Sequence, residues 1–569
     1  MEWKSRNEGE LPASPVALPQ SIWQILYTRG IRTTEDIENH LNPKLKNLSH
    51  PFSMDGMKDA VDRLVAAFIA NETVAIYGDY DLDGTPGVSL LKSGLESLGY
   101  QNVLTDQPLR LKDGYGLHNH KIHTLKEKGT TLIVTVDVGI TDVEPIAYAK
   151  TLGLDVIITD HHLPKDELPQ AFAIVNPNKK ECGSGLQFLC GTGVAFYLIL
   201  ALKMEMKAKN LLTLDFNPKE LLDLFAIATV TDMVPLIKEN RILVKHGLKE
   251  LQMTKRPGIR ALMQNLKMYG RSLDAYDISF KLAPKLNALS RLEEGLRPLD
   301  VFLADEEKAF AITDEILAVN DRRRQYQKTA ESEAEEMMNA SPEKDFIWVF
   351  SENFHPGVVS LVANGLMNKY GKPAFVGAIR DGGKIIGSAR SPDAKINLQN
   401  VFGGVSGSLH KFGGHAMAAG FETHLEKAKI LGADLKNYFI DNIHSEGIMQ
   451  LDPDAAEELL YDAEMNINDF TPQFMNWYDA LGPFGMGFKQ PLFLMKDLKV
   501  KRLQVMKRKK LKYFLTSSQS YSTIEAPWFQ KPVEIPEGSQ VDILFEPQWN
   551  EYMGRRSLQA LIKDMRVRS

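Results

Sequence analysis

The sequence contains only two cysteines, Cys182 and Cys190, among 569 residues. Two thiols are too few for a disulfide framework or for a metal site built from cysteines, so we expect a protein of a reducing compartment. Long apolar runs are also missing, because the longest, from Val194 to Leu202, has nine residues and is too short to span a bilayer. The N-terminal residues lack the apolar core of a signal peptide. The sequence therefore predicts a cytoplasmic protein that does not associate with membranes.

Positive charge is not in excess either, since the net charge is −6. A polyanionic partner would have to be held by local basic patches and metal ions, because the overall field does not attract it. One such patch is the segment from Lys499 to Lys512, which contains the tetrad Lys507, Arg508, Lys509 and Lys510. This tetrad predicts a contact with DNA; a solvated charged face is the alternative. The length of the chain predicts three or more domains.

The stretch from Val74 to Gly84 is the most informative part of the chain. It begins with a short apolar run typical of a buried β-strand and continues with aspartates at alternate positions, Asp79, Asp81 and Asp83. Alternate side chains of an extended chain point to the same side, so the three carboxylates would converge and repel one another without a cation among them. Hard divalent cations prefer such oxygen ligands. The pattern favours a metal site over a solvated acidic turn.

Strands and helices alternate after this stretch, which predicts a parallel sheet. The expected elements are a helix over 88–98 and strands over 102–104, 132–137 and 156–160. Ligands of such sheets bind beyond the carboxyl ends of the strands. Asp79, Asp137 and Asp160 each stand at the end of a predicted strand, so we expect them to lie together.

Asp232 closes an apolar helix that is predicted over residues 221–231. An uncompensated carboxylate in apolar surroundings is costly, so we expect this side chain to have a partner. A metal ion is one candidate. A helix N-cap role or a salt bridge with Arg241 is the other.

The rest of the chain predicts a helical cap, a connecting helix and two further domains. Helices are expected over 21–29, from 33 onward, over 58–70 and over 305–338, the last spanning roughly 50 Å. A second α/β unit is expected from strands 346–350, 374–376 and 384–387 with a helix over 358–370. Short strands over 493–496, 513–516, 541–545 and 557–562 predict a small β-barrel of the oligonucleotide-binding type. Its aromatic residues Trp528, Phe529, Trp549 and Tyr552 would either stack bases or fill the core.

These residues form part of a longer set of motifs. In chain order the motifs are Arg29–Ile31, Tyr77–Gly84, Gly114–Leu117, Val175–Pro177, Gly191–Phe196, Asp232–Leu236, Pro284–Arg291, His355–Val358, Gly387–Ser391, Gly413–Gly420 and Pro483–Gly485. Together they resemble the DHH phosphoesterase superfamily, which is named for an Asp-His-His motif, here Asp160-His161-His162. Within that superfamily the chain is similar, over nearly its whole length, to the branch of single-strand-specific DNA exonucleases.

The resemblance implies an α/β fold with three main parts. A parallel-sheet DHH domain and a DHH-associated α/β domain are joined by a long helix, and an oligonucleotide-binding β-barrel follows. The expected domains are an N-terminal helical cap (1–70), the DHH catalytic domain (71–250), a helical linker (251–340), the DHH-associated domain (341–450) and the barrel (451–569).

The resemblance also implies a site with two ions, either Mn²⁺ or Mg²⁺. The expected metal ligands are Asp79, Asp81, Asp83, Asp137, His161 and Asp232, with Asp137 as the bridge between the ions. Three residues are expected to be catalytic: Asp79 completes the first site or orients its water, Asp160 holds a histidine, and His162 contacts the scissile phosphate. The expected contacts with the DNA strand are Arg110, Asn287, Arg291, Arg390, Ser391 and His415.

The implied activity is 5′-to-3′ hydrolysis of single-stranded DNA by two-metal-ion catalysis, in DNA repair and recombination. The expected partners are single-stranded DNA, a helicase and a single-strand-binding protein, and the enzyme is expected to be a monomer. One alternative is a superfamily branch that cleaves short oligonucleotides or cyclic dinucleotides, but that branch normally lacks the barrel and the basic segment. The other is a replication-associated scaffold that binds single strands without cleaving them. Loss of aspartates would indicate a scaffold, and here the set is intact.

Overall fold

The structure is a computed structural model. It describes residues 2–212, 216–340, 345–444, 458–506, 510–517, 520–529, 533–552 and 555–568. The chain divides into two compact units, one of Met1–His50, Met233–Leu248 and Asp454–Ser569, the other of Pro51–Asp232 and Lys249–Pro453. The helices expected in the N-terminal cap divide between the units, with α1 (Gln20–Thr28) and α2 (Thr34–Leu41) in the first and α3 (Met57–Ile69) in the second. The boundaries given above for the five domains stay a prediction.

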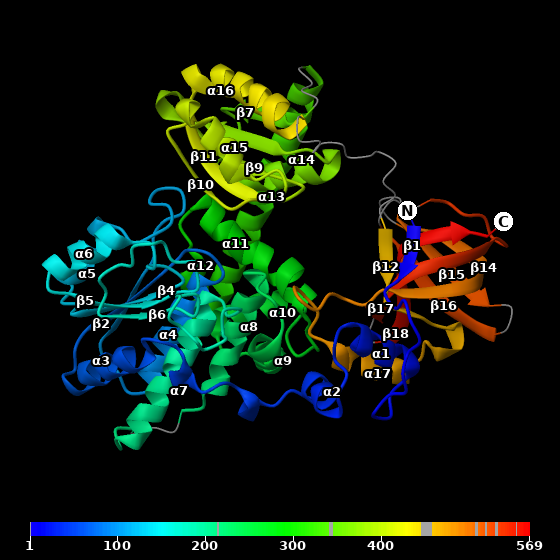
Figure 1. Ribbon diagram of the computed structural model, residues 1–569, viewed down its shortest axis with the longest axis horizontal. Coiled ribbons are helices and arrows are strands. Elements are labelled where there is room, and N and C mark those ends of the chain that lie inside the picture. The colour runs from blue at the N-terminus through cyan, green and yellow to red at the C-terminus, as the bar shows by residue number, and fades with distance from the viewer. Residues whose placement is uncertain are drawn as a thin grey trace. The chain divides into compact units, whose positions relative to one another are not determined.

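The larger unit contains the expected parallel sheet. Its strands, in spatial order, are β3 (Val103–Asp106), β2 (Val74–Gly78), β4 (Leu132–Val136), β5 (Asp155–Thr159) and β6 (Ala173–Val175), and every pairing is parallel. Helices α5 (Asn119–Glu127) and α6 (Val143–Thr151) cover one face, and α3, α4 (Gly84–Ser97) and α7 (Gly191–Ala208) cover the other (Figure 1). Because both faces are covered, β2 and β4 are buried along their whole length.

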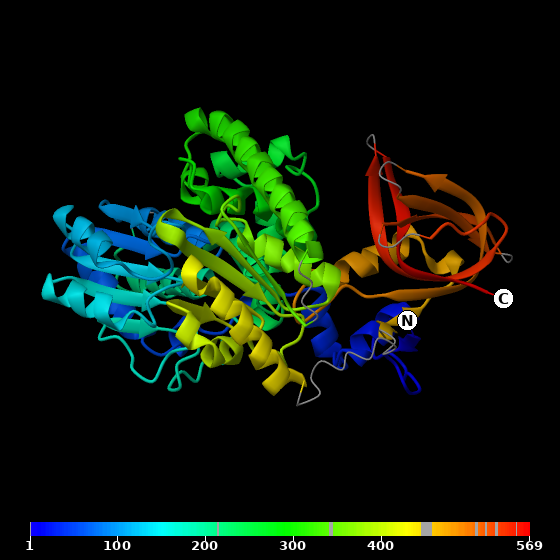
Figure 2. The same ribbon diagram turned by 90° about the horizontal axis from the view of Figure 1, so that it is seen from above.

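Helices follow the sheet and lead to the second α/β part. They are α8 (Leu222–Thr231), α10 (Pro257–Asn265), α11 (Ala283–Leu292), α12 (Pro298–Phe302) and α13 (Glu306–Ala340). Helix α13, the long green helix in Figure 2, has 35 residues and packs against α10 and α11 as well as against the next helix and strand. The predicted connecting helix over 305–338 is thereby confirmed. Among the described residues, no helix combines the length and the apolar character needed to cross a membrane.

A mixed sheet forms the second α/β part of the larger unit. Its spatial order is β10 (Lys411–Gly414), β11 (Ala418–His424), β9 (Lys384–Arg390), β8 (Ala374–Ile379) and β7 (Ile347–Ser351), and only β7 and β8 are parallel. Helices α14 (Val359–Tyr370), α15 (Leu398–Gly404) and α16 (Leu425–Tyr438) pack around it. Gly413 and Gly414 belong to the exposed edge strand β10.

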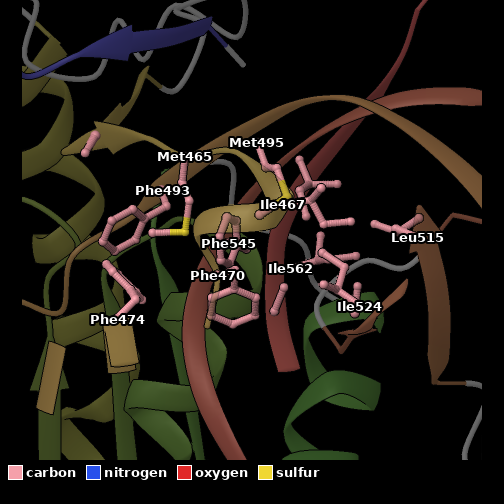
Figure 3. Close-up of a cluster of buried hydrophobic side chains, with 14 of the residues drawn as sticks. Met465, Ile467, Phe470, Phe474, Phe493, Met495, Leu515, Ile524, Phe545 and Ile562 are labelled. Carbon is pink, nitrogen blue, oxygen red and sulfur yellow. The ribbon is translucent and has the colours of Figure 1, made fainter. Parts of the chain in front are cut away.

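The smaller unit contains a closed β-barrel of five strands. They are β14 (Phe493–Val505), β15 (Leu511–Ser517), β16 (Ser520–Trp528), β17 (Gln540–Tyr552) and β18 (Arg555–Val567), and β14 pairs with both β15 and β17, which closes the barrel. Figure 3 shows the core, where Phe470 packs on Phe545 and Phe474 on Phe493. The expected strands are too short, because three of the observed ones have 13 residues. Trp528 is buried in this core, whereas Phe529 is 40% exposed.

Candidate metal centre

The acidic residues expected at the strand ends gather at one edge of the parallel sheet. Asp79 follows β2, Asp137 follows β4 and Asp160 follows β5. Parallel strands end at the same edge, so three separate segments bring their carboxylates together. Asp232 joins them from the C-terminal cap of α8, and the next helix, α9 (Lys238–Gln252), begins only six residues later. It is therefore not an N-cap, as one alternative had it.

Three groups of side chains could each hold a metal ion, with ligand atoms that lie within 4.8 Å of one another. The groups are Asp83, His161 and Asp232; Asp79, Asp81 and Asp137; and Asp137, His161 and His162. The Nε2 atom of His161 lies 3.3 Å from Oδ1 of Asp137 and 3.7 Å from Oδ2 of Asp83 and of Asp232. Asp137 and His161 each take part in two of the groups. Of these two side chains only the carboxylate has two oxygens, so Asp137 is the one that two ions could share.

Four buried polar atoms of this cluster have no hydrogen-bond partner in the described part of the chain. They are Oδ1 of Asp79, Oδ1 of Asp137, Nε2 of His161 and Oδ2 of Asp232. A buried polar atom without a partner is costly, and a buried carboxylate more so. Divalent cations among these atoms would remove that cost, because carboxylate and imidazole are ligands of Mn²⁺ and Mg²⁺ sites. The residues present therefore fit two divalent cations.

The pKa values of the carboxylates in the cluster also indicate that a positive charge is needed. Burial, followed by the repulsion of neighbouring carboxylates, raises the pKa of Asp79 and of Asp137 well above the usual range. Burial and the charges of Asp83 and Asp81 raise the pKa of Asp232 to about 9. These carboxylates cannot all be charged unless positive charge lies among them.

Backbone features hold the acids in place. Asp137 has a φ of 62°, in the left-handed region that a β-carbon disfavours. A Cβ on Gly191 would lie 2.5 Å from the Cβ of Asp137, so this glycine permits the close approach of α7. The first N–H groups of α7, from Gly191 and Thr192, donate to the Asp83 carboxylate at 2.6 and 2.8 Å. The N-terminus of the helix thus orients the Asp83 carboxylate.

Asp160 orients both histidines and is not itself available to a cation. Its Oδ1 accepts hydrogen bonds from the N–H groups of His161 (2.7 Å) and His162 (3.1 Å) and from Nδ1 of His162 (2.8 Å), and its Oδ2 accepts from the N–H of Ile140 (3.0 Å). Burial opposes protonation of His162, but the hydrogen bond and charge of Asp160 raise the pKa of this imidazole to about 9. The geometry agrees with the expectation that Asp160 holds a histidine.

Tyr115 is a contact of the cluster to which the sequence motif Gly114–Leu117 gave no role. Its hydroxyl lies 3.3 Å from Nδ1 of His162 and 3.4 Å from the carbonyl of Asp137. Gly114 and Gly116 on either side have φ values of 80° and 109°. Two glycines with positive φ around one tyrosine were the available signal that this loop is shaped to deliver the side chain.

Three of the arginines expected to contact the strand lie near one another. Arg291 donates to Oγ of Ser360 (2.9 Å) and Arg390 to Oγ of Ser388 (2.8 Å). Arg110 lies over the Tyr80 ring, at 4.7 Å from its centroid. Burial, followed by the charges of Arg110, Arg323 and Arg390, lowers the pKa of Arg291 to about 9.

None of these three guanidinium groups pairs with a carboxylate among the described residues. This arrangement leaves their charge available to a phosphate.

The other expected strand contacts have mixed surroundings. Asn287 is half-buried on α11, and His415 is exposed after β10. Ser391 is buried and its hydroxyl donates to the Asp393 carbonyl at 2.9 Å. The ammonium of Lys510 lies 4.5 Å from the centroid of Phe529.

Lys507, Arg508 and Lys509 lie outside the described residues. Arg241, the expected alternative partner of Asp232, donates its hydrogen bonds to the backbone carbonyls of His40, Leu481 and Gly482.

Three protein-family models match the chain. They are the DHH family, N-terminal domain (residues 73–229), the DHHA1 domain (343–440) and the RecJ OB domain (461–564). The matched ranges fall on the parallel sheet, on the mixed sheet and on the barrel. They agree with the fold class expected from the sequence.

Similar proteins are known in bacteria. The chain is 35% identical to the single-stranded-DNA-specific exonuclease RecJ of Bacillus subtilis over 95% of this chain and 67% of that protein. It is 31% identical to the exonuclease of the same name from Salmonella typhimurium, over 99% of this chain and 98% of that protein. The RecJ of Thermus thermophilus, solved with Mn²⁺, has a similar structure, with a TM-score of 0.77, 26% sequence identity and coverage of 96% of this chain and 76% of that one. The same Thermus protein solved with Mg²⁺ gives a TM-score of 0.71 at 25% identity, over 96% of this chain and 74% of that one.

Proposed function

Because the chain belongs to the RecJ family of single-stranded-DNA-specific exonucleases, we propose that it hydrolyses single-stranded DNA from the 5′ end with two divalent cations, Mn²⁺ or Mg²⁺. The observation that supports this most strongly is the set of four buried ligand atoms without hydrogen-bond partners at the edge of the sheet. Such atoms destabilise the folded state unless cations lie among them.

We assign Asp79, Asp81, Asp83, Asp137, His161 and Asp232 as the residues that hold the cations. Burial lowers the pKa of His161, which keeps its imidazole neutral, the form that binds metals. When bound, two such cations supply Lewis acidity at the phosphate and stabilise the negative charge that develops there. Asp137 is assigned as the shared ligand because its carboxylate borders two of the groups.

The remaining residues position the substrate. Asp160 fixes the His162 ring so that Nδ1 donates to the carboxylate, and the other ring nitrogen is then directed to the scissile phosphate. A charged imidazole, together with the guanidinium groups of Arg110, Arg291 and Arg390, would neutralise the phosphates of the strand. We assign Asn287, Ser391 and His415 to the same strand on the resemblance alone.

The proposed function also assigns the remaining parts of the chain. We propose that the five domains have the boundaries given above, and that the barrel and the basic tetrad Lys507–Lys510 bind the strand away from the metal centre. We also propose that the enzyme is a monomer, acts in the cytoplasm in repair and recombination, and works with a helicase and a single-strand-binding protein. Aromatic residues that stack on bases and basic grooves bind single strands without sequence preference, as the proposed strand binding by the barrel and the tetrad requires.

The test is digestion of single strands labelled at the 5′ or the 3′ end, in the presence of Mn²⁺, with a duplex of the same sequence as control. We expect short labelled products at once from the 5′-labelled strand, slow shortening of the 3′-labelled strand, and an intact duplex. The opposite order of products would reject the polarity, and no cleavage of any single strand would reject the enzyme.

The same assay separates the alternative substrate class. If a dinucleotide were cleaved faster than a long strand, the protein would be a short-oligonucleotide phosphodiesterase. The presence of the barrel, whose family model is matched over residues 461–564, favours the long strand.

A further inference from the structure

An exposed aromatic pair lies on the same helical segment as Arg291. Tyr276 and Phe280 are 59% and 63% exposed, and their rings stack with centroids 4.6 Å apart and an interplanar angle of 27°. Tyr276 directly precedes η4 (Asp277–Leu282), and Phe280 lies within it. This π-helical turn continues directly into α11. Two aromatic rings stacked on each other and open to solvent offer a flat surface on which another ring can stack.

The pair is continuous with the arginine cluster. Tyr276, Phe280, Pro284, Asn287 and Arg291 follow one another at intervals of three or four residues, the spacing that places side chains on one face of a helix. The residues between them that face the protein interior are Ile278, Leu282, Leu286 and Leu289, all buried. From Arg291 to Phe280 the face extends for roughly 16 Å at the rise of an α-helix.

Lys285 and Arg323 lie near this face, and neither forms a direct ion pair in the described part of the chain, although the charge of Asp321 acts on Lys285. Lys285 is only 9% exposed, and among the described residues its ammonium has neither an ion pair nor a hydrogen bond. Burial, followed by the charges of Arg324 and Arg323, lowers its pKa. Arg323 donates to Oδ1 of Asn320 (2.8 Å) and to Oε1 of Gln327 (2.9 Å), both uncharged. Cations that lack a direct carboxylate partner in this way favour an anionic ligand.

Acidic groups next to the aromatic pair are already engaged. Asp274 and Asp277 accept hydrogen bonds from each other's N–H groups, at 2.9 and 3.2 Å, which caps the start of the helix. The ammonium of Lys281 donates to Oδ1 of Asp277 at 2.5 Å. The charge of Asp277 is thus offset by a direct ion pair, whereas Lys285 and Arg323 have no such pair in the described part of the chain.

We propose that the exposed face from Tyr276 to Arg291 binds the DNA strand beyond the metal centre, with bases stacked on the Tyr276–Phe280 pair and phosphates near Lys285 and Arg323. This inference rests on the proposed function, which supplies the strand. A strand advances 3.4 Å per nucleotide in a duplex and more when extended. The aromatic pair would then meet bases about three to five nucleotides from the phosphate at Arg291.

The first test is the affinity of the full-length protein for single strands in EDTA, where no strand is cleaved. For a strand of about 20 nucleotides, Tyr276→Ala combined with Phe280→Ala should weaken binding by about 5- to 100-fold, the range measured for the loss of one stacked base. Binding of a dinucleotide, which is too short to reach the pair, should not change. Phe310→Ala is the matched control, because Phe310 is 71% exposed on α13 and outside the proposed face; it should bind both strands like the wild type.

The second test reads stacking directly. A strand that carries the fluorescent base 2-aminopurine at successive positions should lose fluorescence on binding at about the third to fifth position, because stacking quenches this base. The double alanine variant should abolish that quenching, and Tyr276→Phe should keep it.

Equal affinity of the wild type and the double variant, with unchanged quenching, would overturn the proposal and leave the pair as a contact for another protein. A wild-type protein that binds strands in this way but degrades none with Mn²⁺ would refute the proposed exonuclease and leave the binding face standing.

Discussion

The variant Asp137→Asn tests whether Asp137 is a metal ligand or a structural acid. The ligand oxygens of Asp79, Asp81 and Asp137 lie within 4.8 Å of one another. At an effective dielectric constant of about 20, two unit charges at that separation repel by about 3 kcal/mol. Part of this repulsion is already relieved by protonation, since the pKa of Asp137 is raised. We therefore expect Asp137→Asn to stabilise the metal-free protein by about 1–3 kcal/mol.

Asparagine suits the position in other respects. It tolerates the left-handed backbone conformation better than most residues, and the backbone N–H of residue 137 would still donate to the Thr159 carbonyl. Its amide offers a donor to the neighbouring acids, where the carboxylate Oδ1 has no partner. Alanine would confuse the result, because it adds backbone strain to the loss of the charge.

Divalent cations should reverse the order of stability. A ligand at 100 times its dissociation constant stabilises a protein by about 2.7 kcal/mol per site, so the wild type should unfold at a higher temperature in Mn²⁺ than in EDTA. The asparagine variant should lose most of that gain. Release of nucleotides should fall at least about 100-fold, which corresponds to about 3 kcal/mol of lost transition-state stabilisation.

The assay is thermal unfolding in EDTA and in Mn²⁺, with Asp223→Asn as the matched control. Asp223 is equally buried, but its carboxylate accepts from Thr254 (2.7 Å) and from Nε of Arg256 (3.1 Å). Its replacement should destabilise the protein in both conditions, because it leaves Arg256 without its counter-charge. If Asp137→Asn behaved like the control, Asp137 would be a structural acid and the metal centre would be wrongly assigned.

Gly191→Ala should abolish both the stabilisation by Mn²⁺ and the activity, since the new Cβ would lie 2.5 Å from that of Asp137; Gly183→Ala, which meets no atom within 4 Å, should change neither. Replacing Lys507–Lys510 by glutamine should weaken the binding of long single strands and reduce the slope of log affinity against log salt by about 0.7 for each lost phosphate contact. An unchanged slope would make the tetrad a solvated face. Burial and neighbouring cations lower the pKa of His40 to about 2, so the unfolded state takes up the proton below pH 6.5 and the folded state does not. His40→Gln should therefore remove about 2 kcal/mol of the stability lost between pH 6.5 and 4.5 in denaturant titrations; an identical pH dependence in both proteins would contradict this.

The edge of the parallel sheet was predictable because its signal is local. The strands around Val74 and Leu132 are apolar runs that end in an aspartate, and alternating helices make the sheet parallel. Those two facts bring Asp79, Asp137 and Asp160 together before any contact is known.

The different roles of these acids could not be predicted from the local sequence. Asp137 and Asp160 both end a strand, but only tertiary contacts leave Oδ1 of Asp137 unpartnered and give every oxygen of Asp160 a donor. Likewise, the N–H donors of Asp83 come from Gly191 and Thr192, 108 and 109 residues further along the chain. Spacing within a motif cannot reveal such contacts.

The length of the barrel strands was predicted wrongly for a different reason. Leu498 and Val500 are buried in β14, whereas Lys499 and Lys501 between and after them are exposed. The alternation ends at a register shift between Val500 and Arg502, but the strand itself continues to Val505. The many lysines and arginines concealed the length of this strand in the sequence, because these charges lie on the solvent side of a strand whose other side faces the core.

Two uncompensated charge clusters of opposite sign remain within the larger unit. Burial and Asp81 raise the pKa of Asp79, and the charge of Arg110 opposes this rise only in part. The acids keep buried oxygens without donors in the described part of the chain, and Arg291 and Arg390 bond to neutral groups. Ion pairs between the clusters would have been the simplest way to reduce both costs. The fold instead keeps the two clusters unpaired, at a cost in stability that bound cations and phosphates would reduce. Each ligand would relieve repulsion that opposes the other, so we expect the binding of metal and of strand to be positively coupled.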